Sequence, residues 1–189
     1  MKNMIYFTSD THFGHDREFI WKARGFNSVE EMNEEIIKRF NSKVTAEDDL
    51  YILGDIIMGD ASNIEYVKRL NGKIHIIFGN HDTPARREMY EELKNVVECS
   101  WANMIKYKKQ FIFLSHFPTV TTNEDIKEIQ SLKQCVLNFY AHTHQATPFF
   151  EDNPRMFHVG VDSNNCYPIL IDDALATVNE KFNNVKKGD

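Results

Sequence analysis

The sequence has few cysteines and no long apolar segment. Its three cysteines, Cys99, Cys135 and Cys166, are widely spaced and form no C-x-x-C pair. This argues against a disulfide framework and against a thiolate metal site. No apolar run approaches the roughly 18 residues of a membrane helix. Residues 1–10 lack the apolar stretch and the small-residue cleavage site of a signal peptide. The sequence therefore predicts a cytoplasmic protein that does not enter a membrane.

Positive charge is also scarce. The chain has 22 Lys and Arg against 28 Asp and Glu, for a formal net charge of -6. Non-specific nucleic-acid binding depends on clustered Lys and Arg, and the one tight basic group, residues 106–109, has the polar pattern of a solvated hairpin turn. The sequence thus predicts no strong nucleic-acid patch. An acidic protein that binds phosphates needs a local reversal of charge, and bound divalent cations are the obvious source.

Internal repeats, low-complexity tracts and Pro/Gly/Ser-rich linkers are absent from the sequence as well. The 189 residues have the length of one ordinary domain, and their 42% hydrophobic and 26% charged residues are ordinary globular values. A domain of this size buries enough surface to fold without a disulfide or a structural metal. We therefore expect a single domain over residues 1–189.

Short apolar runs alternate with helical patterns through the first half of the chain. Residues 4–7, 50–53 and 74–78 predict strands, and a segment with helix-start signals follows each of them. The order β-α-β-α-β-α predicts right-handed crossovers and parallel pairing. The helix-start signals are the capping boxes Ser28-Val29-Glu30-Glu31 and Ser62-Asn63-Ile64-Glu65 and the pair Thr83-Pro84.

The pattern changes after residue 100. Two apolar runs with a polar turn between them predict a hairpin over residues 101–106 and 111–114. A sheet that begins parallel and ends in hairpins is expected to be mixed, with helices outside it. Further strands are predicted over residues 136–140, 156–161 and 169–171, and helices over residues 123–134 and 174–182.

Five of the predicted strands end in Asp, Asn or His. In open α/β sheets, ligands bind in the crevice outside the carboxyl ends of the strands. Five of the eight histidines lie at these five strand ends, which a chance scatter would not produce. We interpret the placement as a binding site. The strand-end residues are Asp10, His12, Asp55, Asn80, His81, Asp82, His116, His142 and His144.

Seven of these side chains are candidate metal ligands. Carboxylates, imidazoles and one amide oxygen, without a thiolate, suit Mn, Fe, Zn, Ni or Co. Each short motif alone is more often a turn or a surface strand, but seven ligands are too many for one ion and fit two. Two ions about 3.5 to 4 Å apart need a bridging carboxylate. The candidate ligands are Asp10, His12, Asp55, Asn80, His116, His142 and His144.

The motifs that contain these residues resemble the five blocks of the calcineurin-like metallophosphoesterase superfamily, especially its small single-domain bacterial and phage members. The likeness extends from residue 4 to about residue 171. It implies an α/β fold, a four-layer α/β/β/α sandwich of two mixed sheets flanked by helices, with a dimetal centre at its upper edge. The blocks are Asp10-x-His12, Gly54-Asp55, Gly79-Asn80-His81-Asp82, His116 and His142-x-His144.

The resemblance also implies a role for each residue. Asp10, His12, Asp55 and His144 would hold the first metal ion. Asp55, as the bridge, would hold the second ion with Asn80, His116 and His142. His81 would bind the phosphate and protonate the leaving group. The expected substrate contacts are His15, Arg17, Asn80 and His81.

Three features depart from the pattern of the superfamily. Ala141 stands where the last block usually has a glycine. The second block continues as residues 56–60 without the additional Asp and Arg of the Ser/Thr protein phosphatases, which argues against a phosphoprotein phosphatase. This difference leaves open what orients His81, for which Asp82 and Asp60 are candidates. Little sequence is left for a cap domain.

We expect a phosphoesterase that uses two divalent ions and hydrolyses phosphate esters by in-line attack of a metal-bridging hydroxide, with His81 as the acid. Phosphodiesters are favoured over monoesters, because a missing cap implies an open site. The expected substrate is a small phosphate ester, which includes nucleotide-like compounds. A metal-dependent nuclease and a non-catalytic interaction module on the same fold are the alternatives. No G-x-S-x-G or Walker A sequence supports a serine hydrolase or a P-loop enzyme.

Three other histidines have less certain roles. His15 follows the first block and could reach the phosphate together with Arg17, while a simple loop histidine is an equal alternative. His75 and His158 lie inside predicted strands, so we expect them to pack or to pair with polar neighbours rather than to bind metal.

Overall fold

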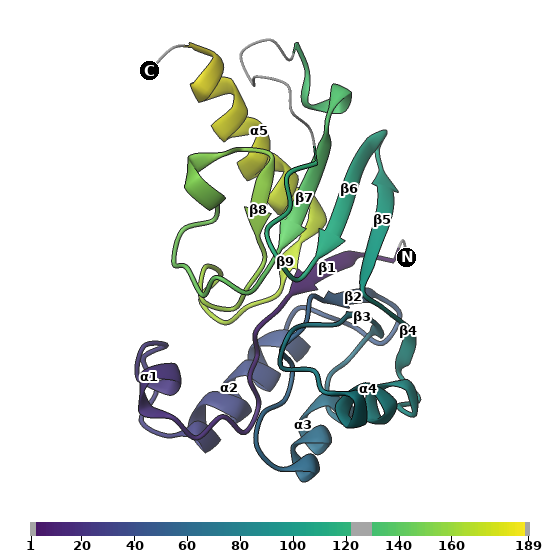
Figure 1. Cartoon of the computed structure of the whole chain (residues 1–189), viewed down its shortest axis with the longest axis vertical. Helices are drawn as coiled ribbons and strands as arrows, with labels where there is room; N and C mark the ends of the chain where they lie inside the picture. The colour runs from purple at the N-terminus through teal and green to yellow at the C-terminus, as the bar shows by residue number, and fades with distance from the viewer. Residues whose placement is uncertain (1–2, 122–129, 188–189) are drawn as a thin grey trace.

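Two mixed β-sheets form the centre of the protein (Figure 1). The computed structural model describes residues 3–121 and 130–187. The first sheet has the order β4-β3-β2-β1-β9, in which β1 to β4 are parallel and β9 runs antiparallel to β1. Its strands are β1 (Ile5–Thr8), β2 (Asp49–Ile52), β3 (Lys73–Ile77), β4 (Val96–Ser100) and β9 (Ile169–Leu170).

The second sheet has the order β5-β6-β7-β8. The hairpin β5-β6 is antiparallel, whereas β6, β7 and β8 are parallel. The strands are β5 (Ala102–Tyr107), β6 (Gln110–Ser115), β7 (Val136–Tyr140) and β8 (Met156–His158). The two sheets meet where the ring of Phe7 on β1 packs edge-on against Phe139 on β7, with ring centroids 5.1 Å apart.

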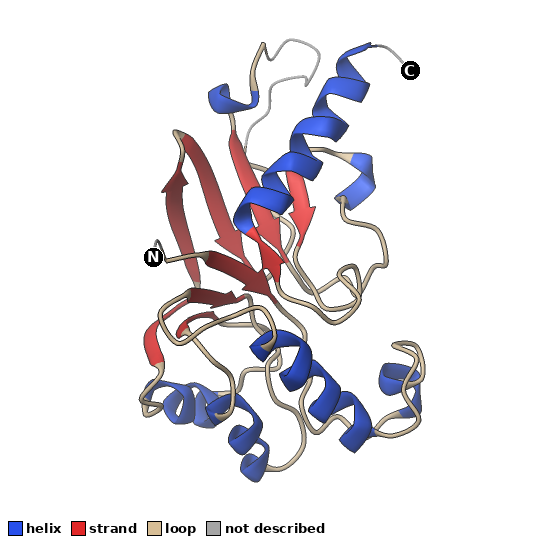
Figure 2. Cartoon of the chain, turned by 180° about the vertical axis from the view of Figure 1, so that it is seen from behind, coloured by secondary structure: helices blue, strands red, loops and turns tan. Residues whose placement is uncertain are grey.

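Helices cover the sheets, as Figure 2 shows from behind. Residues of α2, α3 and α4 share one apolar core with the outward-facing residues of the first sheet, and residues of α5 share a second core with both sheets. The predicted α/β sandwich of two mixed sheets flanked by helices is thus confirmed. The helices are α1 (Glu18–Trp21), α2 (Val29–Asn41), α3 (Ile64–Lys68), α4 (Pro84–Glu91) and α5 (Ile171–Lys187), with short 3-10 turns at Ala61–Asn63, Leu132–Gln134 and Phe150–Asp152.

Alternation along the strands assigns side chains to the two cores. On β2, Leu50 and Ile52 are fully buried in the helix-side core. Tyr51 and Leu53 belong to the core between the sheets. This follows from the two-residue period of a strand, which sends successive side chains to opposite faces. The central strands are therefore buried on both faces, which is why they read as continuous apolar runs in the sequence.

Helix caps agree with the sequence at two of three positions. The Ser28 hydroxyl accepts a hydrogen bond from the Glu31 amide (3.1 Å) and begins α2, and Thr83 caps α4, which has a proline in its first turn. The predicted start at Ser62 is wrong. The Asp60 carboxylate accepts from the Ser62 amide (2.8 Å), so the turn that leads into α3 begins two residues earlier.

Other predictions needed correction. Strand β4 was not predicted, because its burial is partial along its whole length and it lacks a continuous apolar core pattern. The short α1 was also missed, and the last helix is longer at both ends than predicted. The helix predicted over residues 123–134 lies mostly outside the described residues, of which Leu132–Gln134 form a 3-10 turn. Within the described parts of the chain, every helix is too short or too polar to cross a bilayer.

Candidate metal centre

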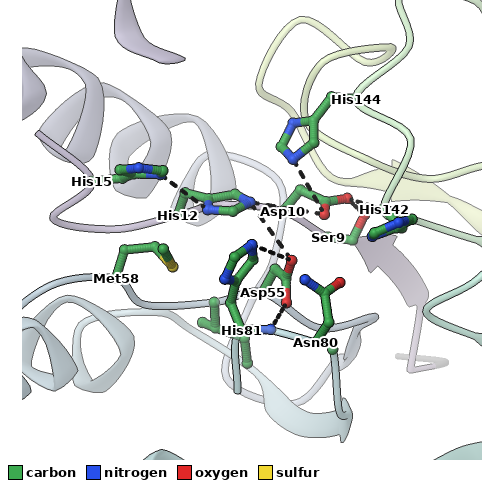
Figure 3. Close-up of polar contacts among 12 residues, drawn as sticks. Ser9, Asp10, His12, His15, Asp55, Met58, Asn80, His81, His142 and His144 are labelled. Carbon is green, nitrogen blue, oxygen red and sulfur yellow. Dashed lines mark hydrogen bonds and ion pairs between the residues drawn. The ribbon is translucent and has the colours of Figure 1, made fainter. Parts of the chain in front are cut away.

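The predicted ligands lie on loops at one edge of the two sheets (Figure 3). Strands β1, β2 and β3 are parallel and in register, as are β6 and β7, so the loops that follow them leave from the same edge. Backbone hydrogen bonds join these loops, from the Asp10 amide to the Gly54 carbonyl oxygen (3.0 Å) and from the Ala141 amide to the His116 carbonyl oxygen (3.0 Å). The sequence positions that end the strands therefore converge in space.

Five of the seven predicted ligands have left-handed backbone conformations. Their φ angles lie between 48° and 70°, a region that non-glycine residues rarely occupy and that concentrates at functional sites. The five residues are Asp10, His12, Asp55, His142 and His144.

Two glycines allow the ligand loops to approach one another. A Cβ at Gly54 would lie 2.7 Å from His116 Nδ1, and one at Gly79 would lie 2.2 Å from Asp55 Oδ1. Real Cβ atoms do not make such close contacts, and Gly54 also has a φ of 88°. The glycines before Asp55 and Asn80 are therefore required by the packing of the site.

Asp10, His12 and His144 form the first of two ligand clusters, which we call cluster 1. Each residue offers an atom within 4.8 Å of the others. Asp10 and His12 are 0% and 2% exposed, yet among the described residues Asp10 Oδ1 and His12 Nε2 have no hydrogen-bond partner, although they lie 4.0 Å apart. Unpartnered buried polar atoms are costly. A carboxylate oxygen and an imidazole nitrogen directed at one point fit a divalent cation.

Asp55, His116 and His142 form cluster 2, in which each residue again offers a ligand atom within 4.8 Å of the others. His116 donates from Nδ1 to the Leu53 carbonyl oxygen (2.7 Å), which leaves Nε2 facing the site. This Nε2 lies 2.9 Å from Asn80 Oδ1 and 3.4 Å from Asp55 Oδ2. The amide of Asn80 thus belongs to the same group.

Asp55 joins the two clusters. Its Oδ2 lies 3.9 Å from His12 Nε2 in cluster 1 and 3.4 Å from His116 Nε2 in cluster 2. A carboxylate between two sets of ligands is what a pair of neighbouring metal ions requires. All seven predicted ligands are therefore brought together, and their donor atoms fit two divalent ions.

The pKa values agree with a metal-binding function. Burial, together with the Arg24 guanidinium, lowers the pKa of His12 to about 2, so its imidazole is neutral and keeps a free lone pair. Burial raises the pKa of Asp55, but the hydrogen bond and charge of His116, the His81 amide and the charge of His12 together outweigh it and lower the pKa to about 2. The bridging carboxylate is thus ionised and can bind cations.

His81 stands at the mouth of the site. Its side chain is 47% exposed, and its Nε2 lies 4.0 Å from Asp55 Oδ2. The backbone fixes its position, because its amide donates to Asp55 Oδ1 (2.8 Å) and its carbonyl oxygen accepts from the Arg86 guanidinium (2.6 Å). Figure 3 shows the imidazole directed toward Asp55 and His12.

Within the part of the chain that the structure describes, neither Asp60 nor Asp82, the two candidates for orienting His81, hydrogen-bonds to its imidazole. Asp60 caps the turn before α3. Asp82 is fully buried, and its Oδ2 accepts hydrogen bonds from the amides of Asp55 (3.0 Å) and Gly79 (2.8 Å), while its Oδ1 accepts from the Tyr90 hydroxyl (2.9 Å). Asp82 therefore joins the second and third ligand loops and does not orient His81.

The motifs did not identify two residues that support cluster 1. Asp162 Oδ2 lies 2.9 Å from His144 Nδ1, which turns His144 Nε2 toward Asp10 Oδ1 at 3.8 Å. The Arg24 guanidinium donates to both oxygens of Asp162 (2.8 and 3.1 Å) and to the carbonyl oxygens of Asp10 and Thr11. Arg24 is 138 residues from Asp162, so spacing along the chain gave no signal.

The remaining predictions have mixed outcomes. His15 lies beside the site, with its Nδ1 3.3 Å from His12 Nδ1, whereas Arg17 is exposed at the start of α1. His75 pairs with Asp49 (2.9 Å) on the first sheet, and buried His158 lies 2.8 Å from the Ser163 hydroxyl, as expected for structural histidines. The substrate contacts of His15 and Arg17 stay predictions.

Known proteins are similar to this chain in sequence. Residues 4–161 match the family model of the calcineurin-like phosphoesterase superfamily domain. The chain is 30% identical over 173 residues to the uncharacterized protein MJ1445 of Methanocaldococcus jannaschii, covering 89% of this chain and 87% of that protein. It is 29% identical over 182 residues to the Gene 66 protein of Mycobacterium phage L5, covering 84% and 86%.

A solved structure has the same fold. The protein of unknown function AQ665 from Aquifex aeolicus superposes with a TM-score of 0.68 at 24% identity, over 93% of this chain and 99% of that one. The family match spans all five ligand blocks, and the structure brings the residues of those blocks together around two clusters that could hold metal ions. The chain therefore belongs to the calcineurin-like phosphoesterase superfamily and is a metal-dependent phosphoester hydrolase.

Proposed function

We propose that the protein hydrolyses phosphodiesters with two divalent metal ions. The observation that carries the proposal is the pair of ligand clusters joined at Asp55, with Asp10 Oδ1 and His12 Nε2 buried and unpartnered. Cluster 1 with Asp55 would hold one ion, and cluster 2 with Asn80 would hold the other. The oxygen and nitrogen donors favour Mn, Fe, Zn, Ni or Co.

The ions would neutralise charge on the phosphate oxygens and lower the pKa of a water molecule for in-line attack. The protein side chains would do the rest. Asp55 would keep the two ions at a fixed separation, because its carboxylate faces both clusters. His81 would donate a proton to the departing alkoxide, since its imidazole is half exposed beside Asp55 and its backbone is held on both sides by hydrogen bonds.

The preference for diesters rests on the openness of the site. His81 is 47% exposed and His144 is 34% exposed, so the edge of the clusters faces solvent. A diester places a second ester group beside the reacting phosphate, and an open edge accommodates it. A diester with an alkyl alcohol also has a poor leaving group, for which a proton donor such as His81 matters most.

A metal-dependence panel tests this function. Purified protein would be stripped with chelator and assayed with Mn, Ni, Mg or no metal on bis-p-nitrophenyl phosphate, p-nitrophenyl phosphate, a cyclic dinucleotide and single-stranded DNA. We expect metal-dependent cleavage that is faster on the small diester than on the monoester. Faster cleavage of DNA would support a nuclease instead, although the net charge of -6 argues against one. No turnover with any metal would support a non-catalytic module.

A further inference from the structure

Two exposed phenylalanines stand on opposite sides of the metal centre. Phe19 is 69% exposed and Phe117 is 50% exposed. Isolated exposed apolar residues are common and need no explanation. These two differ because the ring of each contacts a histidine of the site, Phe19 through His15 and Phe117 through His142.

Phe19 forms the wall beside cluster 1. On α1, its neighbours Ile20 and Trp21 are both 9% exposed and anchor the helix to the core, which leaves Phe19 facing outward. Its ring centroid lies 5.9 Å from that of His15, and the His15 ring lies 5.3 Å from that of His12. An apolar ring is thus presented next to the cluster without being packed into it.

Phe117 forms the wall beside cluster 2. Its ring packs edge-on against His142 at 4.7 Å and against His116 at 5.1 Å. Its carbonyl oxygen accepts hydrogen bonds from the hydroxyls of Ser115 (2.8 Å) and Thr119 (3.0 Å). The loop is therefore fixed, and half of the ring remains open to solvent.

We infer that Phe19 and Phe117 bind planar unsaturated rings on the two ester arms of a phosphodiester. The inference rests on the proposed function, in which the reacting phosphate lies at Asp55 between the two clusters, and the two phenylalanines flank that position through His15 and His142. Planar rings stack on aromatic side chains with little regard to their substituents. The substrate class is thus a diester with a ring on each arm, such as a dinucleoside phosphate or a diaryl phosphate. An aliphatic diester would leave both walls uncovered.

Three substrates with the same p-nitrophenyl leaving group test the inference in the full chain. They are bis-p-nitrophenyl phosphate, the p-nitrophenyl ester of thymidine 5′-phosphate, and ethyl p-nitrophenyl phosphate, whose second arm has no ring. We expect the two ring-bearing diesters to have kcat/KM values at least about tenfold above that of the ethyl diester, as base stacking on aromatic side chains contributes elsewhere. If the thymidine ester is cleaved faster than bis-p-nitrophenyl phosphate, the rings that the protein prefers are nucleobases. If the two are cleaved at equal rates, the protein accepts planar rings of any kind.

Leucine variants separate ring stacking from packing. Phe19→Leu and Phe117→Leu keep an apolar side chain, and each should lower kcat/KM on bis-p-nitrophenyl phosphate by about fivefold or more. On the ethyl diester, only the variant on the leaving-group side should have an effect. The matched control is Phe111→Leu, whose residue is 42% exposed at the start of β6, away from the ligand loops; it should leave every rate unchanged.

Equal losses on all three substrates, or no loss, would overturn the inference. Failure of the proposed function would look different, since the wild-type protein would then cleave none of the diesters. In that case calorimetry still decides: bis-p-nitrophenyl phosphate should bind the Mn-loaded protein about tenfold more tightly than diethyl phosphate, and both leucine variants should lose this difference. Equal binding of the two diesters by the wild-type protein would refute the aromatic walls.

Discussion

The two ligand clusters differ in the hydrogen bonds that their ligand atoms make before any ion binds. In cluster 1, Asp10 Oδ1 and His12 Nε2 are buried and have no hydrogen-bond partner in the described parts of the chain. In cluster 2, His116 Nε2 already lies within hydrogen-bond distance of Asn80 Oδ1, at 2.9 Å. An ion that binds cluster 1 removes the free-energy cost of these unpartnered buried atoms. An ion that binds cluster 2 must replace the contact between His116 and Asn80.

The supports of the two clusters differ as well. Cluster 1 depends on a salt bridge between Arg24 and Asp162 that orients His144. The loop of Asp55 in cluster 2 is held by the buried carboxylate of Asp82 and the Tyr90 hydroxyl. Ligand orientation by a second layer of hydrogen bonds is a general property of metal sites. We therefore expect cluster 1 to bind its ion more tightly, and the following variants test the two sides separately.

Asp55→Asn should have the largest effect, because it removes the carboxylate that faces both clusters. We expect loss of both ions and a fall in kcat of more than about a thousandfold. Elemental analysis of the purified variant and a metal titration by calorimetry measure the first effect, and hydrolysis of bis-p-nitrophenyl phosphate measures the second. Asp152→Asn is the control, since Asp152 is 81% exposed and pairs with Lys181. A variant that retained two ions would show that the clusters do not depend on a common bridge.

His81→Ala should come next and should separate catalysis from metal binding. The imidazole is half exposed and contributes no atom to either cluster, so both ions should stay bound while kcat falls by about 10²- to 10⁴-fold. The loss should be smaller for p-nitrophenyl esters, whose leaving group needs little protonation, than for alkyl esters. The control His75→Ala removes a histidine that pairs with Asp49 on the first sheet. Equal losses on both kinds of ester would contradict the role of His81 as an acid.

The sequence was sufficient to predict most of the fold and the convergence of the candidate ligands into two clusters. Buried central strands appear in the sequence as continuous apolar runs. The polar residues that directly follow these runs lie at the carboxyl ends of the strands, where ligands bind in such sheets. The positive φ angles of Asp10 and Asp55 follow from the sharp turn that such a strand end makes. The Gly54-Asp55 pair indicates this turn directly, because a side chain at residue 54 would collide with His116.

Sequence spacing could not identify the supports of the site. Arg24 and Asp162 are 138 residues apart and occupy no motif, so only the tertiary fold brings them into contact. Asp82 was recognised as part of a motif, but its role was not, because its hydrogen bonds go to backbone amides rather than to a side chain that a pattern could name. Strand β4 was missed because it lies at the sheet edge and is only partly buried.

Asp162→Asn should weaken cluster 1 selectively. The variant removes the charge that pairs with Arg24 and that holds His144 by Nδ1. We expect the affinity for one ion to fall by about 10- to 100-fold, while the affinity for the other ion stays unchanged. In a two-step metal titration, only one step should then move to a higher metal concentration. Excess metal should restore kcat. Equal displacement of both steps would show that the supports are not separate. A lower Tm of the metal-free protein with unchanged affinities would show that Asp162 supports the fold rather than cluster 1.

Tyr90→Phe should have the smallest effect and should act on the other side. The hydroxyl of this buried residue donates to Asp82 Oδ1 (2.9 Å), and burial beside Asp82 raises the pKa of Tyr90, so it stays a donor at any ordinary pH. Loss of a hydrogen bond to a charged group should lower the free energy of unfolding by about 1.5 to 3 kcal/mol. Cluster 1 should keep its affinity, because the Asp82 carboxylate holds the loops of Asp55 and Gly79, whereas Asp10 and His144 are held through Arg24 and Asp162. Urea unfolding measures the stability of the variant, and the same metal titration measures its affinity for each ion. Tyr66→Phe is the matched control. Together these measurements show whether the hydrogen bond from Tyr90 to Asp82 stabilises the fold more than it supports metal binding. A displaced cluster 1 step in Tyr90→Phe would mean that the two supports form one network through Asp55.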